Sequence, residues 1–188
     1  RTPDFSRLRW HSGRWRHPHG VDYRCVCRAE GLPRLDASAL HDAKQANFHK
    51  LAVAEGLALR PGVAELVTAA QEEGWTLGLV TTTWPPTLDA VFDGLVGALR
   101  REAFSIVIDR TLSGACKPDP RCYELALEQA GLGPEAAIAV EDTPESVASA
   151  RGAGVPTIAF PGVAAIDRDF PGDELVVDAL SAALLSGP

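Results

Sequence analysis

The chain has 188 residues, which is enough for one domain or for a core domain with a small accessory one. Hydrophobic residues make up 46% of it, so the chain can bury a core, and disorder throughout is excluded. No apolar run approaches the roughly 18 residues of a membrane-spanning helix. The formal net charge of −7 argues against a polyanion as partner of the main body.

The N-terminal stretch differs in charge from the rest. Residues 1–19 carry a net charge of +4, which leaves −11 for the remainder. Trp10 and Trp15 could stack on bases there, but we find no nucleic-acid-binding motif around them and expect no nucleic-acid partner. The chain starts with Arg1 and has no methionine, so we interpret it as a fragment or a processed chain.

The four cysteines indicate the compartment. Their spacing matches neither a zinc site with paired Cys-x-x-Cys nor a disulfide framework, and they are Cys25, Cys27, Cys116 and Cys122. We expect reduced thiols in a cytoplasmic protein, or in the plastid stroma if the source is a plant or alga. We also expect a monomer that crosses no membrane.

From about residue 36 onward, predicted helices alternate with predicted strands. The helices are expected over residues 36–56, 61–74, 85–95, 119–127 and 143–152, with a short one at the C-terminus. The strands are expected over the apolar runs 75–80, 104–108, 136–140, 155–160 and 175–177. This alternation predicts an α/β fold with a Rossmann-like parallel sheet and helices on both faces.

Polar residues that could bind a ligand follow one of these strands and lie in the loop before the helix predicted over residues 119–127. Thr81, Thr82 and Thr83 follow the strand over 75–80, and Lys117 lies in a proline-rich loop. Ligands bind at the carboxyl ends of open parallel sheets. Threonine hydroxyls and backbone N–H groups at a helix start can hold a phosphate, and a lysine can neutralise its charge. Taken alone, three threonines after a strand are more often a polar turn, and a lysine in a loop is more often solvated.

Glu141 and Asp142 come directly after the strand over 136–140. Adjacent carboxylates at that place are suited to Mg²⁺, which prefers hard oxygen ligands. The alternative is a helix N-cap, in which Asp142 or Thr143 accepts hydrogen bonds from the N–H groups that follow Pro144. Both roles remain open.

Three segments together resemble a known family. Leu79-Val-Thr-Thr-Thr-Trp-Pro85, Cys116-Lys-Pro-Asp-Pro120 and Ala139-Val-Glu-Asp-Thr-Pro-Glu-Ser146 resemble motifs two, three and four of the haloacid dehalogenase-like superfamily. Leu59-Arg-Pro-Gly-Val63 and Leu175-Val-Val-Asp178 resemble its CbbY-like branch, close to the beta-phosphoglucomutase-like group. The resemblance covers roughly residues 36–180.

The resemblance implies a fold and a set of roles. A Rossmann-like core over residues 58–188 would carry the site, and residues 1–57 would hold an irregular segment and a partial helical cap. By this resemblance, the catalytic residues are Thr81 and Lys117. The substrate-binding residues are Thr82, Thr83 and Lys44, and the ligands of a Mg²⁺ cofactor are Asp142 and Glu141.

One part of the family pattern is missing. Motif one is an Asp-x-Asp at the end of the first strand, and we expect no Asp-x-Asp anywhere in the chain. Asp109 follows the strand over 104–108, but Arg110 and Thr111 come after it. The resemblance therefore implies that the central strand is absent, that its two neighbours have unpaired edges, and that this chain alone is inactive.

We expect the function of a Mg²⁺-dependent phosphatase for a small phosphorylated sugar, such as xylulose bisphosphate. The alternatives are a non-catalytic relative that binds phosphorylated ligands, or a phosphomutase. A nucleotide-binding module is a weaker alternative, because Gly131-Leu-Gly133 and Gly152-Ala-Gly154 follow helices, whereas a dinucleotide loop follows a strand.

Overall fold

The computed structural model describes residues 37–170, 172 and 175–185. The N-terminal stretch, Cys25 and Cys27 lie outside the described residues. The chain divides into two compact units, residues 1–44 and 45–188, each described by itself. This division falls inside a helix, and the expected boundary between residues 57 and 58 stays a prediction.

Five helices occupy the predicted places. They are α2 (Ala37–Glu55), α3 (Val63–Glu72), α4 (Pro85–Gly94), α6 (Arg121–Ala130) and α7 (Pro144–Gly152). The predicted C-terminal helix is a 3₁₀ turn, η4 (Ala182–Leu185). One short helix, α5 (Arg110–Ser113), was not predicted. It forms because the carboxylate of Asp109 accepts hydrogen bonds from the N–H groups of Thr111 and Leu112, at 2.8 and 3.1 Å.

All five strands lie within the predicted runs or overlap them. They are β1 (Gly78–Val80), β2 (Ile106–Ile108), β3 (Ala139–Glu141), β4 (Thr157–Ala159) and β5 (Leu175–Val176). Every pairing is parallel, which confirms the predicted α/β class. Within the described part of the chain the strands form two sheets, one with the order β1-β2 and one with the order β3-β4-β5.

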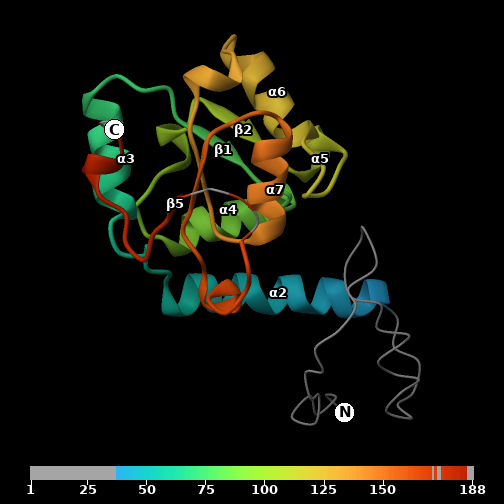
Figure 1. The fold of residues 1–188 in the computed structure, drawn as a ribbon. Coiled ribbons are helices and arrows are strands. Elements are labelled where there is room, and N and C mark those ends of the chain that lie inside the picture. The colour runs from blue at the N-terminus through green and yellow to red at the C-terminus, as the bar shows by residue number, and fades with distance from the viewer. Residues whose placement is uncertain (1–36, 171, 173–174, 186–188) are drawn as a thin grey trace. The chain divides into compact units, whose positions relative to one another are not determined.

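The two sheets share one layer of helices. α6 packs against β1 and β2, α7 packs against β3 and β4, and the two helices contact each other (Figure 1). Buried side chains from both sheets and both helices form one core, which consists of Ile106, Ile108, Cys122, Tyr123, Ala139, Ala150 and Val155. The carboxyl ends of β1 and β3 therefore belong to the same body.

The start of α3 is held against the C-terminal segment by a glycine. Gly62 has a φ of 82°, and a Cβ there would lie 2.0 Å from the carbonyl oxygen of Leu180. Gly74 has a similar φ of 77°, but a Cβ would meet no atom within 4 Å. Only Gly62 therefore combines a left-handed backbone with a close approach of another backbone segment.

We predict that these two glycines respond differently to alanine. Gly74→Ala should lower the free energy of unfolding by about 1–2 kcal/mol, the cost of a left-handed alanine. Gly62→Ala should cost a further 1–3 kcal/mol or so, because the backbone of Leu180 must move. Urea unfolding of both variants measures the difference, and equal losses would contradict the close contact.

Candidate active site

The predicted site residues of the second unit gather at the carboxyl ends of β1 and β3. Thr81 follows β1, Glu141 ends β3, and Lys117 lies in the loop between α5 and α6. The Nζ atom of Lys117 donates a hydrogen bond to the carbonyl of Val80 at 3.1 Å. It also forms an ion pair with Glu141. Lys117 therefore links the ends of the two sheets.

The ion pair of Lys117 and Glu141 is buried and has a third member. The two side chains are only 10% and 9% exposed. The hydroxyl of Tyr123 donates to the same oxygen of Glu141, Oε1, that pairs with Lys117. The Lys117 ammonium also lies 5.2 Å from the centroid of the Tyr123 ring. These contacts hold the lysine in one position at the edge of the sheet.

Tyr123 is a site residue that sequence reasoning missed, since it was treated only as an apolar position of a helix. Burial first, and then the charge of Glu141 and the hydrogen bond to it, raise the pKa of Tyr123 far above its ordinary value. The phenol therefore stays protonated and donates. The sequence signal that could have identified Tyr123 is its place in the first turn of the helix that follows Lys117.

We predict that Tyr123→Phe lowers the free energy of unfolding by about 1.5–3 kcal/mol, the range for a hydrogen bond to a charged group. The ring remains, so packing is preserved and only the donor to Glu141 is lost. Thr157→Val is the control, because it removes a hydroxyl that donates to the carbonyl of Val155 at 2.9 Å. Urea unfolding compares them, and a loss no larger than in the control would contradict the role of Tyr123.

The three threonines form a compact turn ahead of α4. The hydroxyl of Thr81 donates to that of Thr83 at 2.9 Å and accepts the N–H of Thr83 at 3.1 Å. No hydrogen bond from a described residue occupies the side chain or N–H of Thr82. The turn thus has the local structure that its composition predicts, and it also leaves hydrogen-bond donors beside the N-terminus of a helix.

The structure at the start of α7 distinguishes the two roles, helix N-cap and metal ligand, that the sequence left open for Asp142. The hydroxyl of Thr143 accepts the N–H of Ser146 at 3.3 Å, so Thr143 is the N-cap of α7. The carboxylate of Asp142 accepts no hydrogen bond from the described part of the chain, and the residue is exposed. Its backbone carbonyl is held by the N–H of Gly162 at 3.2 Å. Asp142 therefore remains available to a cation.

Of the acidic pair, Asp142 is the residue available to a magnesium ion, which other ligands would complete. The described residues contain no group of three or more His, Cys, Asp or Glu side chains that could hold a metal by themselves. Mg²⁺ commonly takes one or two carboxylates together with waters and phosphate oxygens. Asp142 meets this need from an exposed position. Glu141 as a second ligand stays a prediction, and its Oε1 is already taken by Lys117 and Tyr123.

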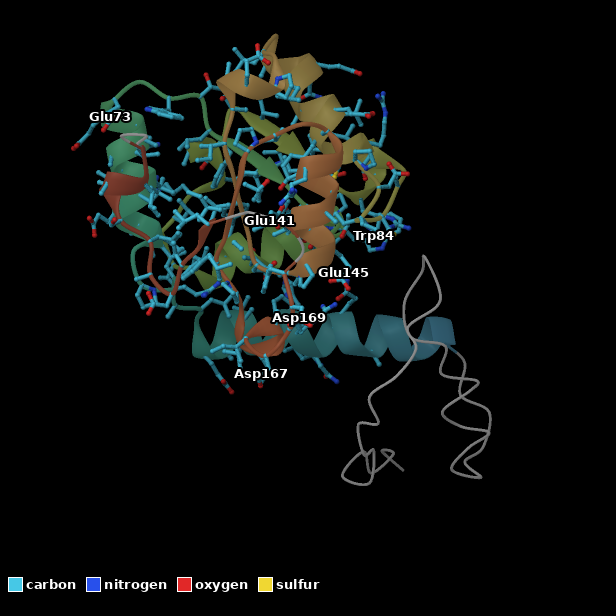
Figure 2. The ribbon with its side chains drawn as sticks, viewed as in Figure 1. Glu73, Trp84, Glu141, Glu145, Asp167 and Asp169 are labelled. Atoms are coloured by element: carbon cyan, nitrogen blue, oxygen red, sulfur yellow. The ribbon has the colours of Figure 1, made fainter. Side chains whose placement is uncertain are left out.

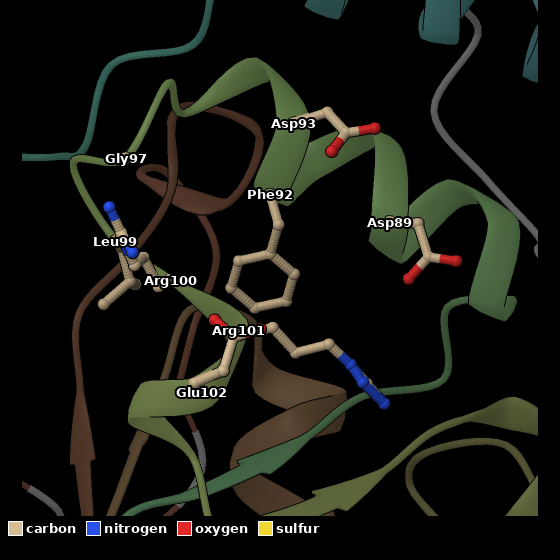
Figure 3. A pocket seen from close by; sticks show the side chains of 8 residues that line it. All are labelled: Asp89, Phe92, Asp93, Gly97, Leu99, Arg100, Arg101 and Glu102. Atoms are coloured by element: carbon tan, nitrogen blue, oxygen red, sulfur yellow. The ribbon is translucent and has the colours of Figure 1, made fainter.

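One predicted residue belongs to the other unit, and one pocket lies away from the candidate site. Lys44 lies in α2 within the first unit, its side chain is outside the described residues, and its contact with a substrate stays a prediction. A pocket of about 490 Å³ lies beside α4 (Figure 3). It is lined by Asp89, Phe92, Asp93, Gly97, Leu99, Arg100, Arg101 and Glu102. Arg101 and Glu102 lead into the amino end of β2. The candidate site lies instead at the carboxyl ends of β1 and β3.

Comparison with known families assigns the chain to one of them. A sequence model of the haloacid dehalogenase-like hydrolases matches residues 18–154. The chain belongs to this family. Protein CbbY of Cupriavidus necator, encoded on a plasmid, is 36% identical over 139 residues, and protein CbbY of Cereibacter sphaeroides is 33% identical over 147 residues. These matches cover 74% and 78% of this chain, but only 55% and 64% of the two relatives.

Solved structures of haloacid dehalogenase-like proteins share the fold. CbbY from Rhodobacter sphaeroides in complex with xylulose-(1,5)-bisphosphate has a TM-score of 0.71 and 32% identity, over 79% of this chain and 66% of that one. CbbY in complex with phosphate has a TM-score of 0.70 and 34% identity, over the same shares of the two chains. A beta-phosphoglucomutase from Clostridium difficile has a TM-score of 0.62 at 16% identity, which shows the fold alone.

This haloacid dehalogenase-like chain does contain one Asp-x-Asp, Asp167-Arg168-Asp169, which sequence reasoning passed over. It follows a 3₁₀ turn, η3 (Val163–Ala165), and not a strand. Both aspartates are exposed (Figure 2). Arg168 forms a two-pronged ion pair with Glu145 at 2.5 and 2.9 Å. The segment therefore lacks the context that motif one requires.

No helix among the described residues has both the length and the hydrophobicity that crossing a membrane would take.

Proposed function

We propose that this chain forms the phosphate- and metal-binding body of a Mg²⁺-dependent phosphatase for a small phosphorylated sugar. The observation that carries the proposal is the position of Lys117, which links the end of β1, next to Thr81, to the acidic pair at the end of β3. The family supports it, as does the 33% identity over 104 residues to a phosphoglycolate phosphatase of Escherichia coli.

Each residue has a role in this proposal that follows from its chemistry. The hydroxyl of Thr81, which without ligand donates to that of Thr83, would turn to donate to a phosphate oxygen. The N–H of Thr82 would donate to another, and the N-terminus of α4 adds a favourable dipole. The ammonium of Lys117 neutralises charge on the phosphoryl group. Asp142, with Glu141 beside it, would hold Mg²⁺, which supplies further charge neutralisation when bound.

The substrate in this proposal is a sugar bisphosphate such as xylulose bisphosphate. The support is the likeness to a CbbY structure that holds that ligand. Lys44 of the predicted cap would contact the sugar phosphate. The protein would act as a monomer in the cytoplasm or, in a plant or alga, in the plastid stroma.

The chain as given would bind without turning over. The side chain of Asp109 follows β2, but its Oδ1 accepts hydrogen bonds from both the hydroxyl and the N–H of Thr111. It is thereby engaged in capping α5 and does not supply the attacking carboxylate.

The lack of an attacking carboxylate keeps open a non-catalytic relative that only binds phosphorylated ligands. A phosphomutase would return the phosphoryl group to a sugar, whereas a phosphatase releases inorganic phosphate.

Calorimetric titration of the 188-residue chain with inorganic phosphate and with xylulose bisphosphate, in the presence of Mg²⁺, tests the proposal. Both ligands should bind, and neither should be hydrolysed. Thr81→Val should weaken binding roughly 10–100-fold, which corresponds to one hydrogen bond to a charged group. Thr157→Val removes a hydroxyl elsewhere and should bind as the unaltered chain does. Absence of phosphate binding, or equal affinities in the two variants, would overturn the site.

A further inference from the structure

An arginine outside the candidate site holds the loop that follows β4. The guanidinium of Arg60 donates hydrogen bonds to the carbonyl of Phe160 at 2.9 Å and to the carbonyl of Pro161 at 2.7 Å. It also stacks on the ring of Phe160, with its Cζ atom 3.3 Å from the ring centroid. These contacts fix residues 160–162, which we call the β4 loop.

The backbone that carries Arg60 is itself fixed. Pro61 restricts the turn that follows, and the N–H of Val63 donates to the carbonyl of Arg60 at 3.2 Å. Gly62 lies so close to the carbonyl of Leu180 that a Cβ would come within 2.0 Å of its oxygen. The side chain of Arg60 therefore reaches the β4 loop from a firmly held turn at the start of α3.

The β4 loop in turn holds the backbone of the acidic pair. The N–H of Phe160 donates to the carbonyl of Glu141 at 2.7 Å, and the N–H of Gly162 donates to the carbonyl of Asp142 at 3.2 Å. The loop also lies beside the carboxylate of Asp142, because a Cβ on Gly162 would be 3.4 Å from its Oδ2 atom. One short loop thus connects Arg60 to Asp142.

The placement of the Asp142 carboxylate depends on its backbone. The side chain of Glu141 is held by Lys117 and Tyr123, whereas the carboxylate of Asp142 accepts no hydrogen bond from a residue that the structure describes. Mg²⁺ demands nearly ideal octahedral geometry, so a displaced ligand lowers its affinity. The β4 loop supplies the support that the side chain of Asp142 lacks.

We propose that Arg60 is a positioning residue for Asp142 as a Mg²⁺ ligand and that it acts through the β4 loop. The inference rests on the proposed function, because it concerns a ligand of the same metal site. A lysine at this place would keep the charge, but it has neither the two-pronged donor geometry nor the planar group that stacks on a ring. Arg60→Lys and Arg60→Met should therefore have the same effect.

The charge of Arg60 alone would have the opposite effect. A guanidinium repels Mg²⁺, so its removal in Arg60→Met would strengthen Mg²⁺ binding if charge were the only influence. Positioning predicts weaker binding in the same variant. The direction of the change in Mg²⁺ affinity therefore separates the two effects.

The first measurement is the metal affinity of the 188-residue chain. Calorimetric titration with Mg²⁺ in the presence of inorganic phosphate compares the unaltered chain with Arg60→Lys and Arg60→Met. Both variants should bind Mg²⁺ about tenfold or more weakly, as found for groups that support a metal ligand. Affinity for phosphate without metal should stay unchanged, because Arg60 holds neither Thr81 nor Lys117.

The second measurement is amide hydrogen exchange, followed by NMR. The amide of Gly162, which donates to Asp142, should exchange about tenfold or more faster in Arg60→Met. The amide of Ala139 donates to the carbonyl of Pro156 at 2.9 Å, at the other end of β3 and β4, and should keep its rate. An unchanged rate at Ala139 excludes a general loss of structure.

Arg121→Met is the control for the loss of an arginine. Arg121 forms ion pairs with Glu124 and Glu128 within α6, at 3.4 and 3.1 Å, and all three side chains are exposed. This variant removes the same charge as Arg60→Met but no contact with the β4 loop. It should leave the Mg²⁺ affinity and both amide exchange rates as they are in the unaltered chain.

Two kinds of failure are distinguishable. An unaltered chain that binds no Mg²⁺ would refute the metal site of the proposed function, and the inference with it. Metal binding that is equal or stronger in Arg60→Met would refute the inference alone. Weaker metal binding would also overturn it if exchange at Gly162 stayed unchanged, or if exchange at Ala139 rose equally.

Discussion

Lys117→Met should lower the free energy of unfolding by about 3–5 kcal/mol, the cost of removing one partner of a buried ion pair. Lys117 and Glu141 are 10% and 9% exposed, so the remaining carboxylate cannot be rehydrated by water. The Tyr123 hydroxyl still donates to it but carries no charge to offset it. Urea unfolding followed by circular dichroism measures the loss.

Two further variants identify the cause of that loss. Glu141→Gln in the Lys117→Met background removes the unpaired negative charge of Glu141. We expect it to recover most of the lost free energy of unfolding. Lys50→Met replaces an exposed lysine and should change stability by no more than about 0.5 kcal/mol. A double variant as unstable as Lys117→Met alone would show that packing, and not the ion pair, is responsible.

Asp142→Asn should weaken Mg²⁺ binding by at least about 10–100-fold, the range found even for groups that only support a metal ligand. The carboxylate is exposed and accepts no hydrogen bond from a described residue, so its loss has no structural cost that could confuse the result. Calorimetric titration with Mg²⁺ in the presence of phosphate gives the affinity.

The control for charge is Glu145→Gln, three residues further along. The hydrogen bond from Arg168 is the main cause that lowers the pKa of Glu145, so its carboxylate is ionised but already paired. This variant removes the same charge and should leave Mg²⁺ affinity almost unchanged. Equal losses in both variants would mean that the general acidity of the region binds the cation and that Asp142 is not a specific ligand.

The positions of the strands could be predicted because apolar runs and helix breakers are local signals. Their lengths could not, because the ends of those runs serve other elements. The N–H of Trp75 donates to the carbonyl of Ala70 at 2.8 Å and so closes α3. The N–H of Phe104 likewise closes a 3₁₀ turn at Arg101. Both residues were predicted to begin strands.

The candidate site residues were predicted where polar residues follow strands, and Tyr123 was missed because its partner is distant in sequence. The pairing of Tyr123 with Glu141 spans 18 positions and depends on how α6 packs on both sheets. Asp109 was set aside as a nucleophile, and its capping role was not foreseen. Burial raises the pKa of Asp109, yet the hydrogen bonds from Thr111 and Leu112 outweigh it, so the pKa lies below its ordinary value.

The division into two sheets could not be read from any local pattern. Apolar runs predict strands but not their neighbours, and the expectation of unpaired edges came from the family resemblance alone. The described strands form two sheets that share a helix layer, and the absence of a central strand stays a prediction.

The most direct test of the account is whether one pocket holds phosphate and metal together. With Mn²⁺ in place of Mg²⁺, the ³¹P relaxation of inorganic phosphate should be strongly enhanced by this chain. The enhancement should disappear in Asp142→Asn, which loses the metal, and in Thr81→Val at the same phosphate concentration. Phosphate that binds with no metal-dependent relaxation would place the anion and the cation in separate sites and would contradict the account.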